Sequence, residues 1–218
     1  SMLSLCEELF LFALDDTTGH MHALPARALD IGLAAAVIMG LHNKKRLRLS
    51  PPHCVVEDTT PMGDPILDET LTKIASHTAE TLGENIRWLA GHAHHIRSVT
   101  IKTLIEKGIL RCEKEKLLWL VPFRRRYPVA DNEEEVLVKE QMRKVLLEGA
   151  KPNSWDIDII TLVDACDLMH TVLSSEELKK ARTAMDKIKA MDPIGLAMAE
   201  SINEVQHTFH EVVAHGML

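Results

Sequence analysis

The chain has 218 residues, of which 46% are hydrophobic and 26% are charged, and its formal net charge is −7. This composition is typical of a globular protein and excludes a fibrous repeat or an extensively disordered chain. The acidic balance also disfavours wholesale nucleic-acid binding, so any anion site must be a local basic patch. We expect one compact domain over residues 3–215, preceded by Ser1 and Met2, which resemble a tag remnant and a start.

The cysteines are scattered along the chain without a CxxC pair, at Cys6, Cys54, Cys112 and Cys166. This spacing predicts a reducing cytosol rather than a disulfide framework or a zinc ribbon. The longest apolar runs are far too short to span a bilayer, so any membrane contact would be peripheral. We therefore expect a cytoplasmic protein.

The N-terminal part of the chain predicts two buried helices. Residues 3–14 form a short helix, which a capping box of Ser4 and Glu7 opens. A turn follows at 15–19, and residues 25–41 form a helix that is apolar almost all round, so it should be central. Short strands are expected at 43–49, with Leu47 and Leu49 facing inward, and at 54–56.

The middle of the chain predicts three helices and a hairpin. The helices lie at residues 66–77, 81–91 and 93–107. Two apolar runs, 109–110 and 117–123, flank the charged segment 111–116, which predicts a β-hairpin with that segment as its solvated tip. Helices at 129–147, 156–173, 174–191 and 194–215 complete a mainly α fold, a single helical domain around a central helix bundle.

An apolar ridge in the second hairpin strand precedes three arginines. If Leu118 and Leu120 fill the core, alternation along the strand turns Leu117, Trp119 and Val121 outward. Such a ridge beside fixed positive charges suits an anionic membrane or a second subunit. Alternatively, the run is a buried strand and the arginines are its solvated end. The membrane or self-association hairpin comprises Leu117, Trp119, Val121 and Phe123, followed by Arg124, Arg125 and Arg126.

Four segments together are typical of one family, namely LSLCEELFLFALDDTTG at 3–19, PMGDPILDETL at 61–71, LIEKGILRCEKEKLLWL at 104–120 and DLMHTVLSSEEL at 167–178. On these segments the chain resembles the Golgi phosphoprotein 3 family from residue 3 to about residue 209. The resemblance implies a mostly helical, non-enzymatic protein, peripheral on the cytosolic face of a membrane through phosphatidylinositol 4-phosphate. It also implies membrane insertion and self-association of the hairpin, and hence a homo-oligomer.

The resemblance also points to a head-group site. In eukaryotic members this site uses a tryptophan, an arginine and two further arginines three residues apart, and the matching positions here are Pro25, Ala34, His94 and Arg97. Arg97 alone keeps the family's residue type, and Pro25 and Ala34 are positional matches only. His94 can donate to a phosphate when it is protonated, but it lacks the fixed fork of arginine. The arginine-bearing N-terminal tail of eukaryotic members is absent, which favours a bacterial member.

The basic residues predict a membrane-facing surface. We expect Arg87 and the arginines at 124–126 to form an anion-binding face with Arg97 and the basic segment 44–48. The alternative is a scattered, solvated set of charges. An anionic phospholipid membrane is therefore the expected partner.

Other classes of site are disfavoured. The histidines His20, His22, His92, His94 and His95 lack the spacing of zinc ligands, so we expect no metal. Asp64, Asp68 and Glu69 suit a helix start better than a catalytic pair, and no catalytic or nucleotide-binding motif is present, so we expect no enzyme and no cofactor.

One alternative from a different class stays open. Helix 96–107 and hairpin 108–122 match the recognition helix and wing of a nucleic-acid-binding winged helix, with Arg97, Lys102 and Lys107 facing phosphates. The net charge and the family resemblance disfavour this alternative, so we expect no nucleic-acid partner.

Overall fold

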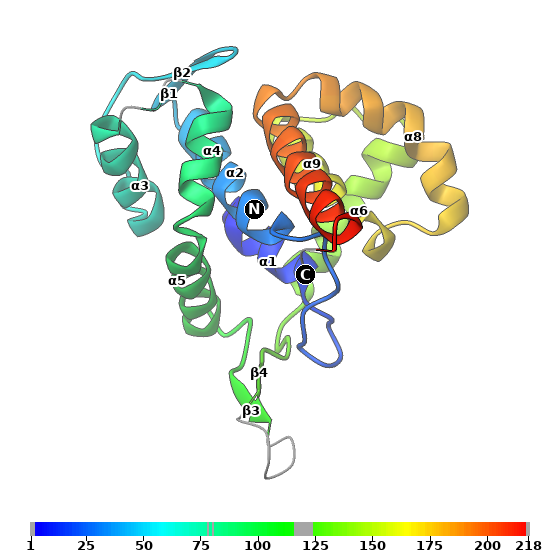
Figure 1. Cartoon of the computed structure of the whole chain (residues 1–218). Helices are drawn as coiled ribbons and strands as arrows, with labels where there is room; N and C mark the ends of the chain where they lie inside the picture. The colour runs from blue at the N-terminus through cyan, green and yellow to red at the C-terminus, as the bar shows by residue number, and fades with distance from the viewer. Residues whose placement is uncertain (1–2, 78, 80, 116–123, 217–218) are drawn as a thin grey trace.

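A computed structural model describes residues 3–77, 79, 81–115 and 124–216 and confirms the predicted mainly α fold. Helix α2 (Ala28–Asn43) lies at the centre, as its all-round apolar sequence predicted, and it contacts α1, α3, α4, α5, α7 and α9. Figure 1 shows α3, α4 and α5 on one side of it and α6, α8 and α9 on the other. Among the described residues, none of the helices has the length and apolar character needed to cross a bilayer.

Helix α1 (Leu5–Ala13) begins at the predicted capping box. The Ser4 hydroxyl accepts from the Glu7 amide at 3.2 Å, and the Glu7 carboxylate accepts from the Ser4 amide at 3.1 Å. Helix α2 begins three residues later than predicted because Arg27 has a left-handed backbone with φ of 59°. The chain between these two helices is therefore longer than the sequence indicated.

The three predicted helices of the middle segment are confirmed within one or two residues at each end. They are α3 (Pro65–Ser76), α4 (Leu82–Ala90) and α5 (Ala93–Glu106). Strands β1 (Leu47–Ser50) and β2 (His53–Val56) pair antiparallel before them. The predicted start of the first strand at residue 43 was wrong, because residue 43 ends α2 and Lys45 turns the chain with φ of 59°.

The predicted hairpin is present, but its strand boundaries were wrong. Strands β3 (Glu113–Glu115) and β4 (Arg124–Arg126) pair with Glu113 opposite Arg126, so the expected solvated tip is largely a strand. Two of the three cross-strand pairs join opposite charges, Glu113 with Arg126 and Glu115 with Arg124, and Arg126 Nη2 lies 2.6 Å from Glu113 Oε2. The first expected strand, 109–110, lies at the base, where Leu110 bridges Val129. The ridge residues Leu117, Trp119, Val121 and Phe123 fall outside the described residues.

The C-terminal part contains α6 (Glu133–Leu147), α7 (Ser154–Ala165), the short 3-10 helix η1 (Met169–Thr171), α8 (Ser175–Ala190) and α9 (Pro193–Ala214). One predicted helix, 156–173, was wrong in its length. It ends at residue 165 because Asp167 adopts a φ of 59°, and a separate short turn follows.

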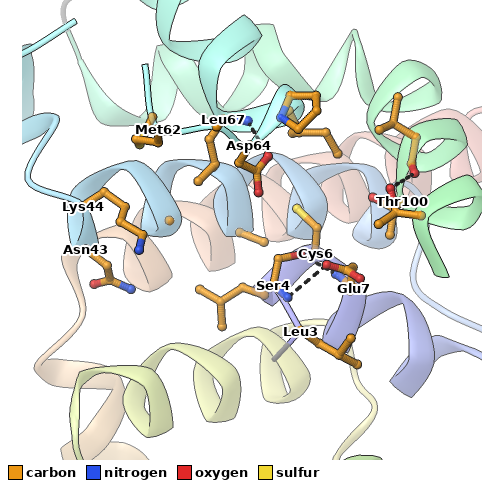
Figure 2. A pocket seen from close by; sticks show the side chains of 18 of the residues that line it. Leu3, Ser4, Cys6, Glu7, Asn43, Lys44, Met62, Asp64, Leu67 and Thr100 are labelled. Carbon is orange, nitrogen blue, oxygen red and sulfur yellow. Dashed lines mark hydrogen bonds between the residues drawn. The ribbon is translucent and has the colours of Figure 1, made fainter. Parts of the chain in front are cut away.

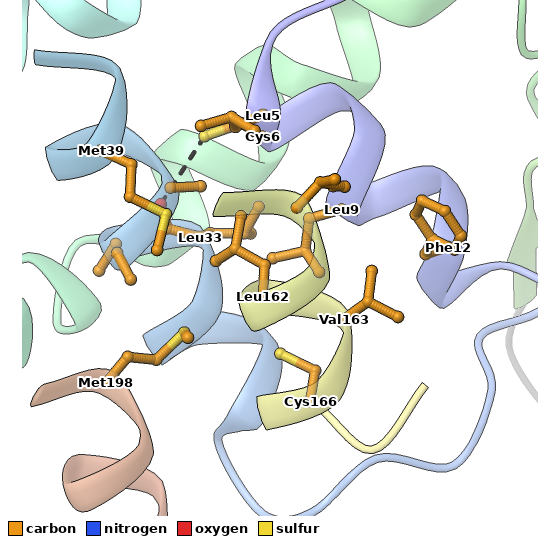
Figure 3. Packing of buried hydrophobic residues seen from close by; sticks show 14 of the residues in the cluster. Leu5, Cys6, Leu9, Phe12, Leu33, Met39, Leu162, Val163, Cys166 and Met198 are labelled. Atoms are coloured by element: carbon orange, nitrogen blue, oxygen red, sulfur yellow. Dashed lines mark hydrogen bonds between the residues drawn. The ribbon is translucent and has the colours of Figure 1, made fainter. Parts of the chain in front are cut away.

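Buried apolar residues from residue 3 to residue 202 form a single cluster. Figure 3 shows its centre, where Leu9 of α1, Leu33 of α2 and Leu162 of α7 meet. The approach of α1 to α2 is close, since a Cβ on Gly32 would lie 2.9 Å from Leu9 Cδ2. This packing fixes α1 and α2 relative to each other, and α5, which carries the predicted head-group residues, contacts both.

Candidate functional site

Arg97 lies where α5, α1 and the base of the hairpin meet. Its guanidinium carbon is 5.9 Å from the centroid of the buried Phe10 ring, a cation–π geometry. Tyr127 also contacts this Phe10 ring, edge-on, with centroids 6.3 Å apart. Arg97 is half-buried, and among the described residues it has no acidic partner. A held guanidinium without a counter-charge is suited to bind an anion.

The base of the hairpin is built by the chain on both sides of it. The Arg111 amide donates to the Pro128 carbonyl at 3.0 Å, and the Tyr127 amide donates to the Gly19 carbonyl at 2.9 Å. Gly19 has φ of +73°, and a Cβ there would lie 2.4 Å from the Pro128 nitrogen. The turn at 15–19 therefore supports the base of the hairpin, next to the aromatic contact that holds Arg97.

The other predicted head-group positions differ in accessibility. His94 is exposed on the first turn of α5, three residues before Arg97, so the two share one face of the helix. Pro25 is half-buried in the loop before α2. Ala34 has no exposed surface, and its methyl group has no hydrogen-bond donor to offer a phosphate.

Arg27 was missed by the sequence analysis. Its Nη2 donates to the Ala90 carbonyl at 3.1 Å, which brings the loop containing Pro25 to the junction between α4 and α5. Its Nε lies 3.8 Å from Asp30 Oδ2, so part of its charge is balanced. No sequence pattern could have found this residue, because positions 27 and 90 meet only in the folded chain.

The expected single basic face is not assembled. Figure 1 shows β1, which carries Arg48, and β4, which begins at Arg124, at opposite ends of the molecule. Several of these arginines have acidic neighbours, namely Arg48 with Glu57 at 2.8 Å, Arg46 with Asp58 at 3.9 Å, Arg87 with Glu204 at 3.9 Å and Arg126 with Glu113 at 2.6 Å. The side chains of Arg124 and Arg125 fall outside the description. For the basic segment 44–48 and Arg87, the alternative of scattered, solvated charges fits the structure better than a shared basic face.

Asp64, Glu69 and His95 make contacts within the protein. Asp64 caps α3 by accepting from the Leu67 amide at 3.0 Å, as predicted for a helix start. Glu69 lies 2.9 Å from His95 Nε2 and 3.1 Å from Lys73 Nζ, and these contacts lower the pKa of Glu69. Within the described residues, no three histidine, cysteine or acidic side chains are placed to hold a metal ion.

A cavity of about 740 Å³ opens beside α1, α2, α3, α5 and α7. Figure 2 shows Lys44 and Asn43 at one side of it, Glu7 and Thr100 at the other, and Cys6 and Leu67 between them. The sequence analysis did not predict this cavity, because its lining comes from five separate segments between residues 3 and 155.

The fold and the site together define a class of protein. The protein is mainly helical and has a candidate anion site beside a hairpin. None of its described helices could span a bilayer. A comparison with protein-family models supports a more specific statement: the model of Golgi phosphoprotein 3 (GPP34) matches residues 5–205. The match covers nearly the whole chain, so the chain belongs to the Golgi phosphoprotein 3 family. That family is Golgi-associated and known for phosphoinositide binding in general.

Proposed function

We propose that this protein binds an anionic phospholipid head group at Arg97 and acts without catalysis as a peripheral membrane protein on the cytosolic face. The observation that carries the proposal is the half-buried Arg97 guanidinium, which lies over Phe10 without an acidic partner among the described residues. A phosphate monoester suits such a group because arginine offers two parallel donors to its oxygens.

The surroundings of Arg97 agree with a ligand that arrives from a membrane. Strand β4 of the adjoining hairpin consists of three arginines, and basic residues near an anionic bilayer contribute about 1 kcal/mol each. His94 lies one helical turn before Arg97, and Arg27 lies at the preceding helix junction. These groups are the donors that we assign to phosphatidylinositol 4-phosphate, the lipid that the family resemblance implies.

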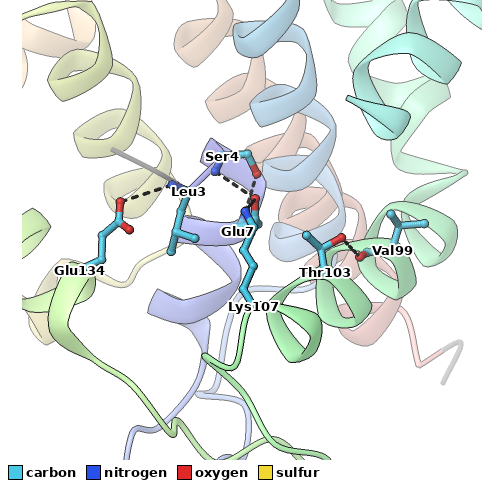
Figure 4. Close-up of polar contacts among 7 residues, drawn as sticks. All are labelled: Leu3, Ser4, Glu7, Val99, Thr103, Lys107 and Glu134. Carbon is cyan, nitrogen blue, oxygen red and sulfur yellow. Dashed lines mark hydrogen bonds and ion pairs between the residues drawn. The ribbon is translucent and has the colours of Figure 1, made fainter. Parts of the chain in front are cut away.

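The winged-helix alternative is less well supported. One of the three basic residues that it would direct to phosphates is engaged within the protein, since Lys107 Nζ is 2.8 Å from Glu7 Oε2. Figure 4 shows Lys107 reaching back to α1 rather than away from the molecule. Catalysis is likewise unsupported, because the family is not known as an enzyme family.

Replacement of Arg97 tests the proposal. Arg97→Ala should weaken binding to vesicles of phosphatidylcholine with phosphatidylinositol 4-phosphate by about 1 to 3 kcal/mol, since a charged hydrogen bond is lost. The measurement is co-sedimentation over a range of vesicle concentrations. Arg182→Ala, on exposed surface of α8, is the matched control and should bind as the parent does. Equal binding of the two variants would remove Arg97 from the site.

A further inference from the structure

The large cavity beside α1 has a mostly apolar interior. Leu3, Cys6, Ile66, Leu67, Val99 and Trp155 are among its lining residues. Ile66, Leu67, Val99 and Trp155 are only half-buried, so apolar surface faces the cavity. Small residues of α2 leave this room, because Ala36 and Gly40 occupy successive turns along the wall. Its volume of about 740 Å³ falls within the usual range for a small-molecule site.

The polar groups of the cavity are almost all used within the protein. Thr100 donates to the Ile96 carbonyl at 2.7 Å, and Thr103 donates to the Val99 carbonyl at 2.9 Å. Asp64 caps α3, and Glu7 both caps α1 and pairs with Lys107. These contacts, partly shown in Figure 4, leave few donors for a polar ligand along the middle of the cavity.

Lys44 is the exception. It is an exposed residue directly after the end of α2, lines the cavity, and has no acidic partner among the described residues. Figure 2 places its side chain at one side of the cavity, away from the Glu7 side. The lining also holds the Asp64 carboxylate, which caps α3, and Lys44 is the lining cation without an acidic partner among the described residues. Apolar walls with a cation at this edge are complementary to a molecule with an apolar body and a single negative end.

We propose that this cavity binds a single acyl chain with an anionic head group, with the chain between α1, α2 and α5 and the head group at Lys44. A free fatty acid and a lysophospholipid share this chemistry. The site is separate from Arg97, which does not line the cavity. The proposal therefore does not depend on head-group binding at Arg97.

Titration with 12-carbon ligands below their micelle concentrations tests the proposal. Dodecanoate or a 12-carbon lysophosphatidic acid should bind the parent, and each methylene removed should weaken binding about threefold to fourfold. Lys44→Met keeps the apolar stem and removes the charge, so it should weaken binding of these anions about tenfold or more. Lys102→Met, an exposed lysine of α5 outside the cavity, is the matched control and should leave binding unchanged.

Two further experiments test where the acyl chain binds and whether the negative charge contributes to binding. A fatty acid brominated in mid-chain should quench the fluorescence of Trp155, and Trp155→Phe should remove that quenching without abolishing binding. Dodecanol, which has no charge, should bind the parent and Lys44→Met equally. The proposal is overturned if neither anion binds the parent, if Lys44→Met and Lys102→Met bind dodecanoate equally, or if the quenching persists in Trp155→Phe.

Discussion

At the scale of single residues, the most unusual electrostatic feature is a pair of carboxyl groups at the start of α9. Asp158 of α7 accepts from Asn43 Nδ2 at 2.8 Å, while Asp192 accepts from the Gly195 amide at 3.0 Å. Burial raises the pKa of Asp158 to about 7 and also raises the pKa of Asp192, and the neighbouring Asp192 carboxylate adds to the rise at Asp158. The pair therefore keeps a proton that the unfolded chain would release.

Asp158→Asn should reduce the dependence of stability on pH. A folded-state pKa above the unfolded value gives stability that is present at low pH and lost as pH rises, here between about pH 4 and pH 7. The asparagine keeps a donor and an acceptor, so the variant should be more stable than the parent at pH 8 by on the order of 1 to 3 kcal/mol. Urea unfolding at several pH values measures this difference.

The quantity to compare is the difference in unfolding free energy between the parent and Asp158→Asn at each pH. Burial also raises the pKa of Glu135 to about 7, and this group contributes to the pH dependence of both. Parallel curves for the parent and Asp158→Asn would show that the proton is not held at Asp158.

The ion pair between Arg143 and Glu177 links α6 to the start of α8. Arg143 Nη2 lies 2.6 Å from Glu177 Oε2, and Arg143 also donates to the Val172 carbonyl. The hydrogen bond from Arg143 and the capping contact with Ser174 lower the pKa of Glu177 to about 2. Such a group stabilises the fold above the unfolded pKa near 4.5, and this contribution is lost as pH falls toward 2.

Glu177→Gln should therefore lower the melting temperature at pH 7, and the difference from the parent should disappear near pH 2. Glu176→Gln changes the same charge one residue earlier, on exposed surface without a contact of this kind, and serves as the control. Thermal unfolding followed by circular dichroism measures both. If the two variants have the same melting temperature at pH 7, the ion pair between α6 and α8 does not contribute to the stability of the fold.

At the scale of elements, helix starts with a capping box were predictable from local sequence. The capping boxes at Ser4 and Ser174 have a local signature, since two residues three apart satisfy each other's backbone groups. The early end of α7, followed by Asp167 with a left-handed backbone, was missed because the sequence analysis continued the apolar pattern through residue 173. The hairpin register was missed for a related reason: the sequence analysis gave apolar runs priority over opposite charges across the strands.

The turn at Gly19 offers a test of how the hairpin is held. Gly19→Ala should destabilise the fold by about 1 to 3 kcal/mol through backbone strain. The clash between the new Cβ and the Pro128 backbone should destabilise it further. It should also weaken vesicle binding, because the base of the hairpin would shift away from Phe10 and Arg97. Gly149→Ala has nearly the same φ, +74°, with nothing within 4 Å of its new Cβ, so it isolates the strain. Equal effects of both variants on stability and binding would contradict this account.

At the scale of the whole molecule, the sequence indicated single residues but not which residues are neighbours. Arg97 was predicted because one family residue is kept, and its role stays a prediction; the structure places its guanidinium over Phe10 of α1. Arg27 and the cavity were missed because their neighbours are distant in sequence. The basic segment 44–48 does not join the arginines of β4, because β1 and β4 lie at opposite ends of the molecule.

The most direct test of membrane recognition is flotation of the parent chain with vesicles of defined charge. Three compositions suffice: phosphatidylcholine alone, phosphatidylcholine with phosphatidylinositol 4-phosphate, and phosphatidylcholine with phosphatidylserine at equal total charge. We expect the protein to float with the anionic vesicles, most strongly with the phosphoinositide, and to stay at the bottom with phosphatidylcholine alone. Recovery at the bottom of the gradient with all three compositions would contradict the proposed function.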